Sequence, residues 1–464
     1  MYTLRGYQDR AVSDCMDYIR GPLNLPVVAV LPTAAGKSLI VNEVAKRVGE
    51  KVLIIQPSIE LLKQNYKKAE ELSCIGMSIY SAGAGEKEFG YLTYVTLGSI
   101  KKEAKKFKAL GFKTVLIDEC HTGVNPSESS MFTKFIKALD PKKVIGFTAT
   151  PYRLNSTLAG TKLTMLNRVI PGYFKKIIHV TQIKEMIDQG FWSDIRYETY
   201  EFDNSGLILN SSGAEFTETS VSQAVQSQGV NNNILMKVLN MQELGYTRIL
   251  VFTDSVPTAK KFSEHVKNSA YITSNTKPKE RERIISEFKS GKIHVLFNYN
   301  ILATGFDYPE LQSVIMGRPT NSLAIFYQIV GRGVRIHPAK KWFHMIDFCG
   351  NVERFGRVEE QEIINYENHG WAVFCKGELV TDVYLNGGYS VTKDDIDNKF
   401  DSDNTELETE KMWFGKYKGK TLPQIMKANP GYFTFMLNNF DFNTPKMYAL
   451  KRDIGKLLKS DALK

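Results

Sequence analysis

The stretch from residue 27 to residue 44 constrains the fold of this chain more than any other part of it. An apolar run, residues 27–31, leads directly into the loop Pro32-Thr33-Ala34-Ala35-Gly36-Lys37-Ser38, which an apolar helical pattern follows. A strand, a tight loop ending in Gly-Lys-Ser and a helix form a unit whose backbone N–H groups surround phosphates. In such a unit Lys37 would reach the β- and γ-phosphates, and Ser38 would ligate Mg²⁺. The stretch predicts a nucleotide-binding α/β domain, with a chance helix start at Gly-Lys-Ser as the alternative.

Short apolar runs alternate with amphipathic helical patterns in two blocks of the chain. Runs of this length, rich in β-branched and aromatic residues and separated by helices, are typical of a parallel sheet covered on both faces. They occupy residues 27–31, 52–55, 92–95, 115–117 and 144–147 in the first block, and 249–252, 269–272, 294–297, 313–316 and 342–346 in the second. We therefore expect an α/β protein with two parallel-sheet domains in tandem.

Changes in composition set the expected domain boundaries. We assign residues 1–180 to the first domain and 246–390 to the second, with a connecting segment, 181–245, that carries a polar insertion or hairpin. Residues 391–411 contain eight acids and three lysines, which indicates a solvated acidic linker. Residues 412–464 reverse the charge, with ten Lys or Arg against three acids. We expect a small basic C-terminal module there.

Lysines and aromatic residues alternate at the start of this basic module. Lys416, Lys418 and Lys420 flank Tyr417 and Gly419. In a nucleic-acid-binding hairpin the lysines would contact phosphates while a ring stacks on a base. The alternative is a basic hairpin whose aromatic residues form its own small core.

Charge and cysteine content narrow the classes of partner. The 464 residues include 60 Lys or Arg and 50 Asp or Glu, a net charge of +10. This balance favours polyanionic partners, because neutralising phosphates releases counterions, although solubility alone would also explain it. No apolar run approaches the roughly 18 residues of a membrane span, and the N-terminus lacks an apolar signal core. The five scattered cysteines form no CxxC pair, so we expect no zinc or disulfide framework and a cytosolic protein.

The run at residues 115–117 ends in Asp118-Glu119-Cys120-His121. Carboxylates at the carboxyl end of a parallel strand lie in the crevice where α/β sheets bind ligands. Asp118 is placed to hold Mg²⁺, and Glu119 to orient or deprotonate an attacking water. Solvated acids at a strand end are the alternative, which the phosphate-binding loop makes less attractive.

The order of the motifs resembles that of the superfamily 2 helicases of the DExH type. Lys37, the Asp-Glu-Cys-His box and Thr148-Ala149-Thr150-Pro151 follow one another as in that family. Residues 4–8 (Leu-Arg-Gly-Tyr-Gln) are similar to its adenine-recognition segment, which implies Gln8 on the base and Tyr7 stacking. Residues 57–64 and 95–99 match its motifs that contact the nucleic-acid strand.

The second block resembles the same family in the same order. Phe252 opens one motif, and residues 298–309 (Asn-Tyr-Asn-Ile-Leu-Ala-Thr-Gly-Phe-Asp-Tyr-Pro) are close to another, in which Thr304 touches the nucleic-acid backbone and Asp307 the ribose. Residues 328–335 (Gln-Ile-Val-Gly-Arg-Gly-Val-Arg) are the most specific match. On a helix, Arg332 and Arg335 would lie on one face, and such paired guanidiniums suit the transferring γ-phosphate. Surface salt bridges are the alternative role for these arginines.

Resemblance and residue chemistry together imply the following site. The catalytic residues are Lys37, Asp118, Glu119, Gln328, Arg332 and Arg335; the ATP-binding residues are Arg5, Tyr7, Gln8, Pro32, Thr33, Ala34, Ala35, Gly36, Lys37, Ser38, Gly305 and Asp307; the coupling residues are His121, Thr148 and Thr150; the nucleic-acid-binding residues are Pro57, Ser58, Gln64, Thr96, Gly98, Ser99, Phe252, Asn298, Thr304, Lys416, Lys418 and Lys420; and Ser38 and Asp118 hold the metal.

One residue departs from the family pattern. The family has Gly where this chain has Ala34. If that position needs a positive φ, Ala costs about 1–2 kcal/mol there, and otherwise the change is harmless.

The resemblance implies two tandem RecA-like domains and an ATP- and Mg²⁺-dependent enzyme. The Asp-Glu-Cys-His box, the Thr-Ala-Thr-Pro-Tyr-Arg run and residues 161–166 look most like DNA-directed members, such as compact phage-encoded branch-migration and recombination helicases. We expect a monomeric, cytoplasmic DNA helicase or translocase that remodels branched DNA in recombination, repair or replication, and that meets proteins of those processes. The alternatives are an RNA-dependent ATPase or RNA helicase, and a nucleotide-switched clamp that hydrolyses too slowly to be a motor.

Overall fold

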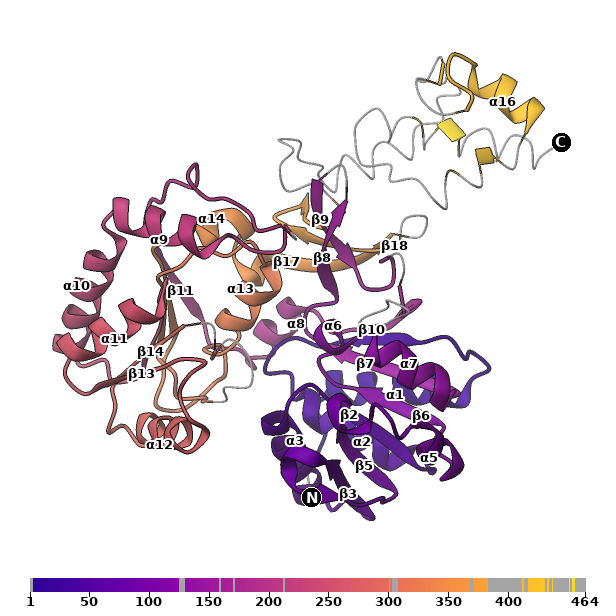
Figure 1. Ribbon diagram of the computed structural model, residues 1–464, viewed down its shortest axis with the longest axis horizontal. Helices are drawn as coiled ribbons and strands as arrows, with labels where there is room; N and C mark the ends of the chain where they lie inside the picture. Colours follow the sequence, from indigo (N-terminus) through magenta and orange to yellow (C-terminus); the bar gives the residue numbers. More distant parts are fainter. Residues whose placement is uncertain are drawn as a thin grey trace.

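The computed structural model describes residues 3–124, 130–157, 160–169, 172–211, 213–299, 301–302, 308–366, 370–382, 411–412 and 416–429, with residues 432, 433, 436, 450, 453 and 454. Two large α/β units lie side by side, and α16 (Leu422–Ala428) stands apart from both (Figure 1). Among the described residues, no helix combines the length and the apolar character needed to cross a membrane.

The N-terminal unit is built on an eight-stranded sheet. Its strands run in the order β10-β1-β7-β6-β2-β5-β3-β4, and every neighbouring pair is parallel except β3 and β4. Every residue of β1, β2, β6 and β7 is buried, as expected for strands covered on both faces. The strands are β1 (Val27–Val30), β2 (Val52–Gln56), β3 (Met77–Ser81), β4 (Glu86–Lys87), β5 (Leu92–Thr96), β6 (Thr114–Ile117), β7 (Lys143–Thr148) and β10 (Lys176–Val180).

Seven helices of this unit are α1 (Gly6–Arg20), α2 (Lys37–Arg47), α3 (Ile59–Glu71), α4 (Leu97–Ile100), α5 (Ala104–Ala109), α6 (Cys120–Gly123) and α7 (Met131–Leu139). Helix α2 begins directly after the loop that follows β1, and α3 begins at the carboxyl end of β2, where Ser58 caps it by accepting from the Leu61 N–H at 3.2 Å. The carboxyl ends of β1, β7, β6 and β2 therefore meet at one edge of the sheet, and the segments that follow them lie together there.

The second unit is built on a six-stranded, all-parallel sheet in the order β11-β16-β15-β12-β14-β13. Its strands are β11 (Ile195–Thr199), β12 (Ile249–Phe252), β13 (Ser269–Ile272), β14 (Val295–Asn298), β15 (Ser313–Met316) and β16 (Phe343–Asp347), and its helices include α9 (Glu218–Ser227), α10 (Val230–Glu243), α11 (Val256–His265), α12 (Pro278–Lys289), α13 (Leu323–Val330) and α14 (Asn351–Phe355). The expected fold class, two parallel-sheet α/β domains in tandem, is confirmed.

Two antiparallel elements join the units. A hairpin of β8 (Tyr152–Thr157) and β9 (Gly160–Met165) lies beside a small sheet of β17 (Gln361–Tyr366), β18 (Gly370–Cys375) and β19 (Glu378–Leu379) (Figure 1). Arg168, just after β9, donates to the Trp371 carbonyl of β18 at 2.7 Å. Gln182, before α8 (Ile183–Asp188), exchanges two hydrogen bonds with the Ile363 backbone of β17.

The tertiary structure differs from the expected boundaries in two places. Strand β11 lies in the segment that the sequence assigns to a connection, yet it pairs with β16 as the edge of the second sheet. Strands β17, β18 and β19 lie within the range expected for the second parallel-sheet domain, yet they form a separate antiparallel sheet. In the polar part of the connection, Leu209 and Phe216 form an isolated antiparallel bridge ahead of α9. The acidic linker, residues 391–411, lies outside the described residues except for Lys411.

The C-terminal residues that are described share an apolar cluster of their own. It contains Met412, Leu422, Ile425, Phe433, Met436, Leu450 and Ile454. Thr421 caps α16 by accepting from the Gln424 N–H. Lys416, Lys418 and Lys420 are exposed, and the ammonium groups of Lys416 and Lys420 lie 5.6 and 5.9 Å from the Tyr417 ring centre.

Candidate active site between the two domains

The loop between β1 and α2 has the backbone of a phosphate cradle. Gly36 adopts φ +75° as the N-cap of α2, and a Cβ there would come within 2.6 Å of Gln8 Nε2. Ala34 also has a left-handed backbone, with φ 62°. The positive φ that the sequence leaves open is therefore present, and Ala34 is strained where the family has Gly.

Three ionisable residues, Lys37, Asp118 and Glu119, lie close together where this loop ends and α2 begins. The Lys37 Nζ lies 2.6 Å from Glu119 Oε1. Burial raises the pKa of Asp118. Burial acts in the same direction on Glu119, but the positive charges around it, that of Lys37 foremost, and the hydrogen bond from Lys37 together hold its pKa below its usual value. Burial would lower the pKa of Lys37, but the negative charges of Glu119 and Asp118 raise it above its usual value. Lys37 and Glu119 are therefore both charged. For Lys37 to bind a phosphate, its ammonium group must first leave the ion pair with Glu119.

The backbone places Glu119 under strain. Its φ is 44°, in the left-handed region that non-glycine residues rarely adopt, and it forms the N-cap of α6. Strain of this kind persists where the surrounding structure holds the residue in place, and it concentrates at active sites. Here the Glu119 N–H donates to Asp118 Oδ1 at 2.9 Å, which holds the Asp118 carboxylate against the Glu119 backbone.

A chain of hydrogen bonds crosses from the first domain to the second. His121 Nδ1 lies 2.8 Å from Thr148 Oγ1, and Gln328 Nε2, on α13, lies 2.9 Å from His121 Nε2. Burial lowers the pKa of His121 to about 4, so the ring is neutral at physiological pH. Thr148 Oγ1 also accepts from the Thr150 N–H at 3.0 Å. The three residues for which the sequence predicts a coupling role, His121, Thr148 and Thr150, form one network with Gln328.

The expected arginine pair does not lie on a helix. Helix α13 ends at Val330, and a turn carries Arg332 before Arg335 forms a backbone bridge with Trp192. The lack of a side chain at Gly331 allows this segment to pack closely on the phosphate loop, since a Cβ there would come within 2.5 Å of Thr33 Oγ1. Burial lowers the pKa of Arg332 to about 10 and also lowers that of Arg335. The charge of Arg332 contributes to the low pKa of Glu119, the carboxylate for which the sequence predicts a catalytic role.

The N-terminus of α1 contacts the phosphate loop in a way that differs from the expectation. Tyr7 is fully buried, and its hydroxyl donates to the Ala35 carbonyl at 3.0 Å. Gln8 Nε2 donates to the same carbonyl at 3.0 Å, and Gln8 Oε1 accepts from the Arg5 N–H. The prediction that Tyr7 stacks on the base is wrong for this conformation, because no surface of the ring is open. Arg5 is the exposed group here, and its guanidinium lies 3.8 Å over the ring of Phe191.

Sequence reasoning missed the residues between the two sheets that hold the loop. Phe191 packs on Tyr7 with ring centres 5.5 Å apart. Trp192 Nε1 donates to the Thr33 carbonyl at 3.0 Å, and the Thr33 N–H donates to Tyr327 Oη at 3.3 Å. The aromatic pair at 191–192 and Tyr327 beside Gln328 are the only signals in the sequence that would have marked them.

The residues expected to contact nucleic acid divide into two groups. Pro57, Gln64 and Gly98 are exposed, and Ser58, Thr96 and Ser99 are half-buried, all beside the carboxyl ends of β2 and β5. In the second domain, Phe252 is 2% exposed and Asn298 is fully buried, with its Nδ2 donating to the Val251 carbonyl at 3.0 Å. Direct strand contact by these two side chains is wrong for this conformation, because they pack inside the sheet. Thr304, Gly305 and Asp307 lie outside the described residues.

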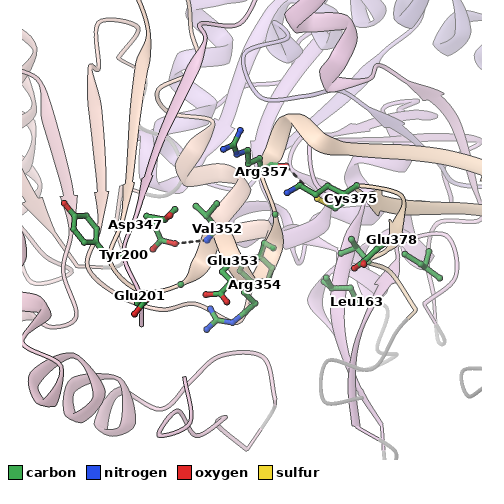
Figure 2. A pocket seen from close by; sticks show the side chains of 17 residues that line it. Leu163, Tyr200, Glu201, Asp347, Val352, Glu353, Arg354, Arg357, Cys375 and Glu378 are labelled. Atoms are coloured by element: carbon green, nitrogen blue, oxygen red, sulfur yellow. Dashed lines mark hydrogen bonds between the residues drawn. The ribbon is translucent and has the colours of Figure 1, made fainter. Parts of the chain in front are cut away.

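A cavity among the described residues lies away from the phosphate loop. It has a volume of about 690 Å³ and opens between the carboxyl ends of β11 and β16, α14, and the strands β18 and β19 (Figure 2). Its polar walls are occupied: Asp347 accepts from the Val352 N–H at 2.7 Å, and Arg354 donates to the Thr320 carbonyl at 2.9 Å. Acidic and basic groups alternate around it, so it favours no charged ligand class.

Buried polar atoms without a hydrogen-bond partner lie near the phosphate loop and the Asp-Glu-Cys-His box. Among the described residues, Thr33 Oγ1, Glu119 Oε2 and Thr150 Oγ1 are buried and make no hydrogen bond. Buried oxygens usually have a partner, so these atoms point to one that binds at this site. Asp118 and Ser38 supply the oxygen ligands that Mg²⁺ prefers. The residues present therefore fit ATP and Mg²⁺.

Three family models match parts of the chain. Residues 1–153 match the family model "Type III restriction enzyme, res subunit", residues 231–337 match "Helicase conserved C-terminal domain", and residues 412–441 match "Exodeoxyribonuclease X-like C-terminal".

Two curated relatives align with most of the two-domain region. The putative ATP-dependent helicase IRC3 of Saccharomyces cerevisiae is 27% identical over 75% of this chain and 51% of its own length. The DNA 3'-5' translocase XPB2 of Sulfurisphaera tokodaii is 26% identical over 72% of this chain and 78% of its own length. The chain thus spans about half the length of the yeast relative.

Solved structures share the fold. The ATP-dependent Type ISP restriction-modification enzyme LlaBIII bound to DNA superposes with a TM-score of 0.55 at 14% identity, over 75% of this chain and 28% of that one. S. cerevisiae Dbp5 bound to RNA and ADP BeF3 superposes with a TM-score of 0.50 at 15% identity, over 76% of this chain and 87% of that one. Motif order, domain architecture and these matches together show that the chain belongs to the superfamily 2 helicases, a family of ATP-hydrolysing enzymes.

Proposed function

We propose that this protein is an ATP-driven DNA helicase or translocase that remodels branched DNA, in recombination, repair or replication. The observation that carries the motor part of the proposal is the contact of Gln328 with His121, which ties the second domain to the Asp-Glu-Cys-His box of the first. A site completed by both domains changes their relative position as it binds and releases its ligand.

In the proposed cycle, Lys37 leaves Glu119 and binds the β- and γ-phosphates. Glu119, freed from its ion pair, orients and deprotonates the attacking water, while Arg332 and Arg335 stabilise the charge that develops on the γ-phosphoryl group. Asp118 and Ser38 would hold Mg²⁺, whose positive charge would help to neutralise the phosphates. His121 stays neutral, and its hydrogen bonds to Thr148 and Gln328 couple the ATP site to both domains.

The DNA part of the proposal rests on three supports. The exposed residues Pro57, Gln64 and Gly98 lie beside the site at the edge of the first sheet, where a strand would cross. The C-terminal segment carries exposed lysines around Tyr417 and matches a module of an exodeoxyribonuclease. The net charge of +10 favours a polyanion.

The decisive experiment measures the ATPase rate at saturating single-stranded DNA, duplex, fork, four-way junction and single-stranded RNA. We expect stimulation by DNA, largest with the fork or junction, and little by RNA. Equal stimulation by RNA would indicate an RNA-dependent ATPase, and equal rates with all DNA forms would remove the preference for branched DNA.

A second candidate function is a nucleotide-switched clamp, favoured by the strained backbone of Ala34 in the phosphate loop. Such a protein would bind nucleic acid in an ATP-dependent manner and turn over too slowly to move along it. A strand-displacement assay with a labelled fork separates the two, because only a motor displaces the strand with repeated ATP hydrolysis.

A further inference from the structure

A buried chain of amide and hydroxyl groups ends on Asp118. Tyr94 donates its hydroxyl to Asn42 Oδ1 at 2.7 Å, and Asn42 Nδ2 donates to the Asn65 carbonyl at 3.2 Å. Asn65 Nδ2 then donates to Asp118 Oδ2 at 2.8 Å. None of these four residues is more than 4% exposed.

Each member of this chain comes from an element that serves the site. Asn42 is on α2, the helix that starts at Lys37, and Tyr94 is on β5, two residues before Thr96. Asn65 is on α3, which follows Pro57 and Ser58 and carries Gln64, three residues proposed to contact the nucleic-acid strand. The chain thus connects the phosphate-loop helix and both strand-contacting segments of the first domain with the carboxylate proposed to hold the metal.

The hydrogen bonds leave the Asp118 carboxylate little freedom to rotate. Its Oδ1 accepts from the Glu119 N–H at 2.9 Å, and its Oδ2 accepts from Asn65. The first bond comes from the neighbouring residue and moves with Asp118. The bond from Asn65 comes from another helix, so it alone makes the carboxylate orientation depend on where α3 lies.

A purely structural role accounts poorly for Asn65. A buried side-chain amide is costly unless its polar atoms are paired, and an apolar residue of similar size would avoid that cost. Asn65 Oδ1 has no hydrogen-bond partner among the described residues, so the amide is only partly satisfied. The one partner that its Nδ2 has is the carboxylate of the active site.

We propose that Asn65 is a positioning residue, which holds the Asp118 carboxylate in its metal-binding orientation and transmits to it the position of α3 when a nucleic-acid strand binds there. The second half of this proposal rests on the proposed function, and the first half does not. A displacement of about 1 Å at a reacting centre changes rates by as much as roughly 100-fold, so a small shift of α3 would suffice to stimulate hydrolysis.

The test compares Asn65→Leu with Tyr94→Phe. Asn65→Leu removes the donor to Asp118 at nearly constant volume. Tyr94→Phe breaks a buried hydrogen bond of the same chain but leaves the contact with Asp118, so it is the matched control for lost stability. Circular dichroism and thermal unfolding without nucleotide establish that both variants fold.

Two readouts separate positioning from structure. The affinity for a fluorescent ATP analogue is measured in EDTA and over a Mg²⁺ titration, and we expect Asn65→Leu to raise the half-saturating Mg²⁺ concentration about tenfold with the affinity in EDTA unchanged. The ratio of DNA-stimulated to basal ATPase rate is measured at saturating DNA, and we expect it to fall towards 1 while the affinity for DNA stays within about twofold of the wild type. Tyr94→Phe should have the same half-saturating Mg²⁺ concentration and the same stimulation ratio as the wild type.

The possible results distinguish the two halves of the proposal. If Asn65→Leu behaves like Tyr94→Phe in both readouts, Asn65 is only a packing residue and the proposal is overturned. If the half-saturating Mg²⁺ concentration rises but the stimulation ratio stays unchanged, Asn65 positions Asp118. The proposal that Asn65 transmits the position of α3 is then wrong. If the wild-type enzyme is not stimulated by any nucleic acid, the proposed function fails, while the Mg²⁺ titration still decides whether Asn65 positions Asp118.

Discussion

Gln328 Nε2 lies 2.9 Å from His121 Nε2, although 207 residues separate the two in the chain. With the Gln328 amide as donor, His121 Nε2 is the acceptor, and the ring proton is on Nδ1, where it is donated to Thr148 Oγ1. The second domain thereby selects the tautomer of a histidine in the first. Any rotation that separates α13 from α6 releases both contacts, which makes His121 the point at which movement of the domains reaches the ATP site.

The protonation of His121 predicts how stability depends on pH. Burial lowers its folded-state pKa to about 4, below the unfolded value of about 6.5. The unfolded chain therefore binds more protons between these values, and stability is full above about pH 6.5 and falls as the pH drops through about 4. Between pH 7 and pH 4, the free energy of unfolding of His121→Gln should fall by up to about 3 kcal/mol less than that of the wild type. Urea unfolding at each pH measures this difference. Parallel stability curves for the two proteins would show that His121 has the same pKa in the folded and unfolded states.

The ion pair of Lys37 and Glu119 predicts opposite defects in two variants. Lys37→Ala should abolish turnover and weaken ATP binding, because the phosphates lose their cation and Glu119 loses its partner. Glu119→Gln should bind ATP at least as tightly as the wild type, since it no longer competes strongly for Lys37, and should lose about 10²–10⁴-fold in kcat. Nucleotide binding and steady-state ATPase assays measure both effects. Near-normal turnover in either variant would remove that residue from the mechanism.

The two arginines of the second domain predict a rate defect without a binding defect. Arg332→Ala and Arg335→Ala should each lower kcat by about 10³–10⁵-fold, with ATP affinity little changed, because they act on charge that develops in the transition state. We expect the larger loss for Arg332, whose charge acts on Glu119. Lys substitutions serve as controls, since they keep the charge and lose the planar fork. If affinity falls while turnover persists, the residue binds ATP without stabilising the transition state.

The left-handed backbone of Ala34 predicts a stabilising substitution. Ala34→Gly relieves about 1–2 kcal/mol of backbone strain in the folded state. Gly also has more conformational freedom than Ala in the unfolded chain, which offsets about 0.4–1 kcal/mol of that gain. We expect a small net gain in unfolding free energy and an ATPase rate equal to the wild type or modestly higher. Ala35→Gly is the matched control, because Ala35 is not among the described non-glycine residues with positive φ and should be destabilised. A large loss of ATPase in Ala34→Gly would mean that the loop adopts another conformation during the cycle.

The basic C-terminal segment predicts a change in salt dependence. A chain ending at Thr409 should keep basal ATPase, bind a four-way junction more weakly and show a shallower dependence of binding on salt. If Lys416, Lys418 and Lys420 each contact a phosphate, the triple alanine variant should lower the slope of log affinity against log salt by roughly 3. Binding is measured at several salt concentrations beside the full-length protein. Equal slopes would assign the segment to stabilisation or protein docking, and loss of basal ATPase would mean that it packs on the motor domains.

Local patterns in the sequence determined the parallel-sheet strands around the site and the order of the motifs. The runs at residues 27–31 and 115–117 become β1 and β6, because short β-branched runs between helices have few other ways to be buried. Helix α2 begins at the Gly-Lys-Ser segment, as predicted. The sequence suffices here because the left-handed N-cap, Gly36, and the first residues of the helix are neighbours in the chain.

Only the tertiary structure decided how the site is completed, because the contacts that complete it join residues far apart in the chain. It turned the Arg332–Arg335 segment out of its expected helix so that Gly331 could pack on Thr33, and it buried Tyr7 against Phe191. It placed Gln328 on His121 and Asn65 on Asp118, two contacts that no periodicity or spacing records. A sequence encodes which side chains are available within a few residues of one another, whereas the packing of whole sheets and helices decides which distant ones meet.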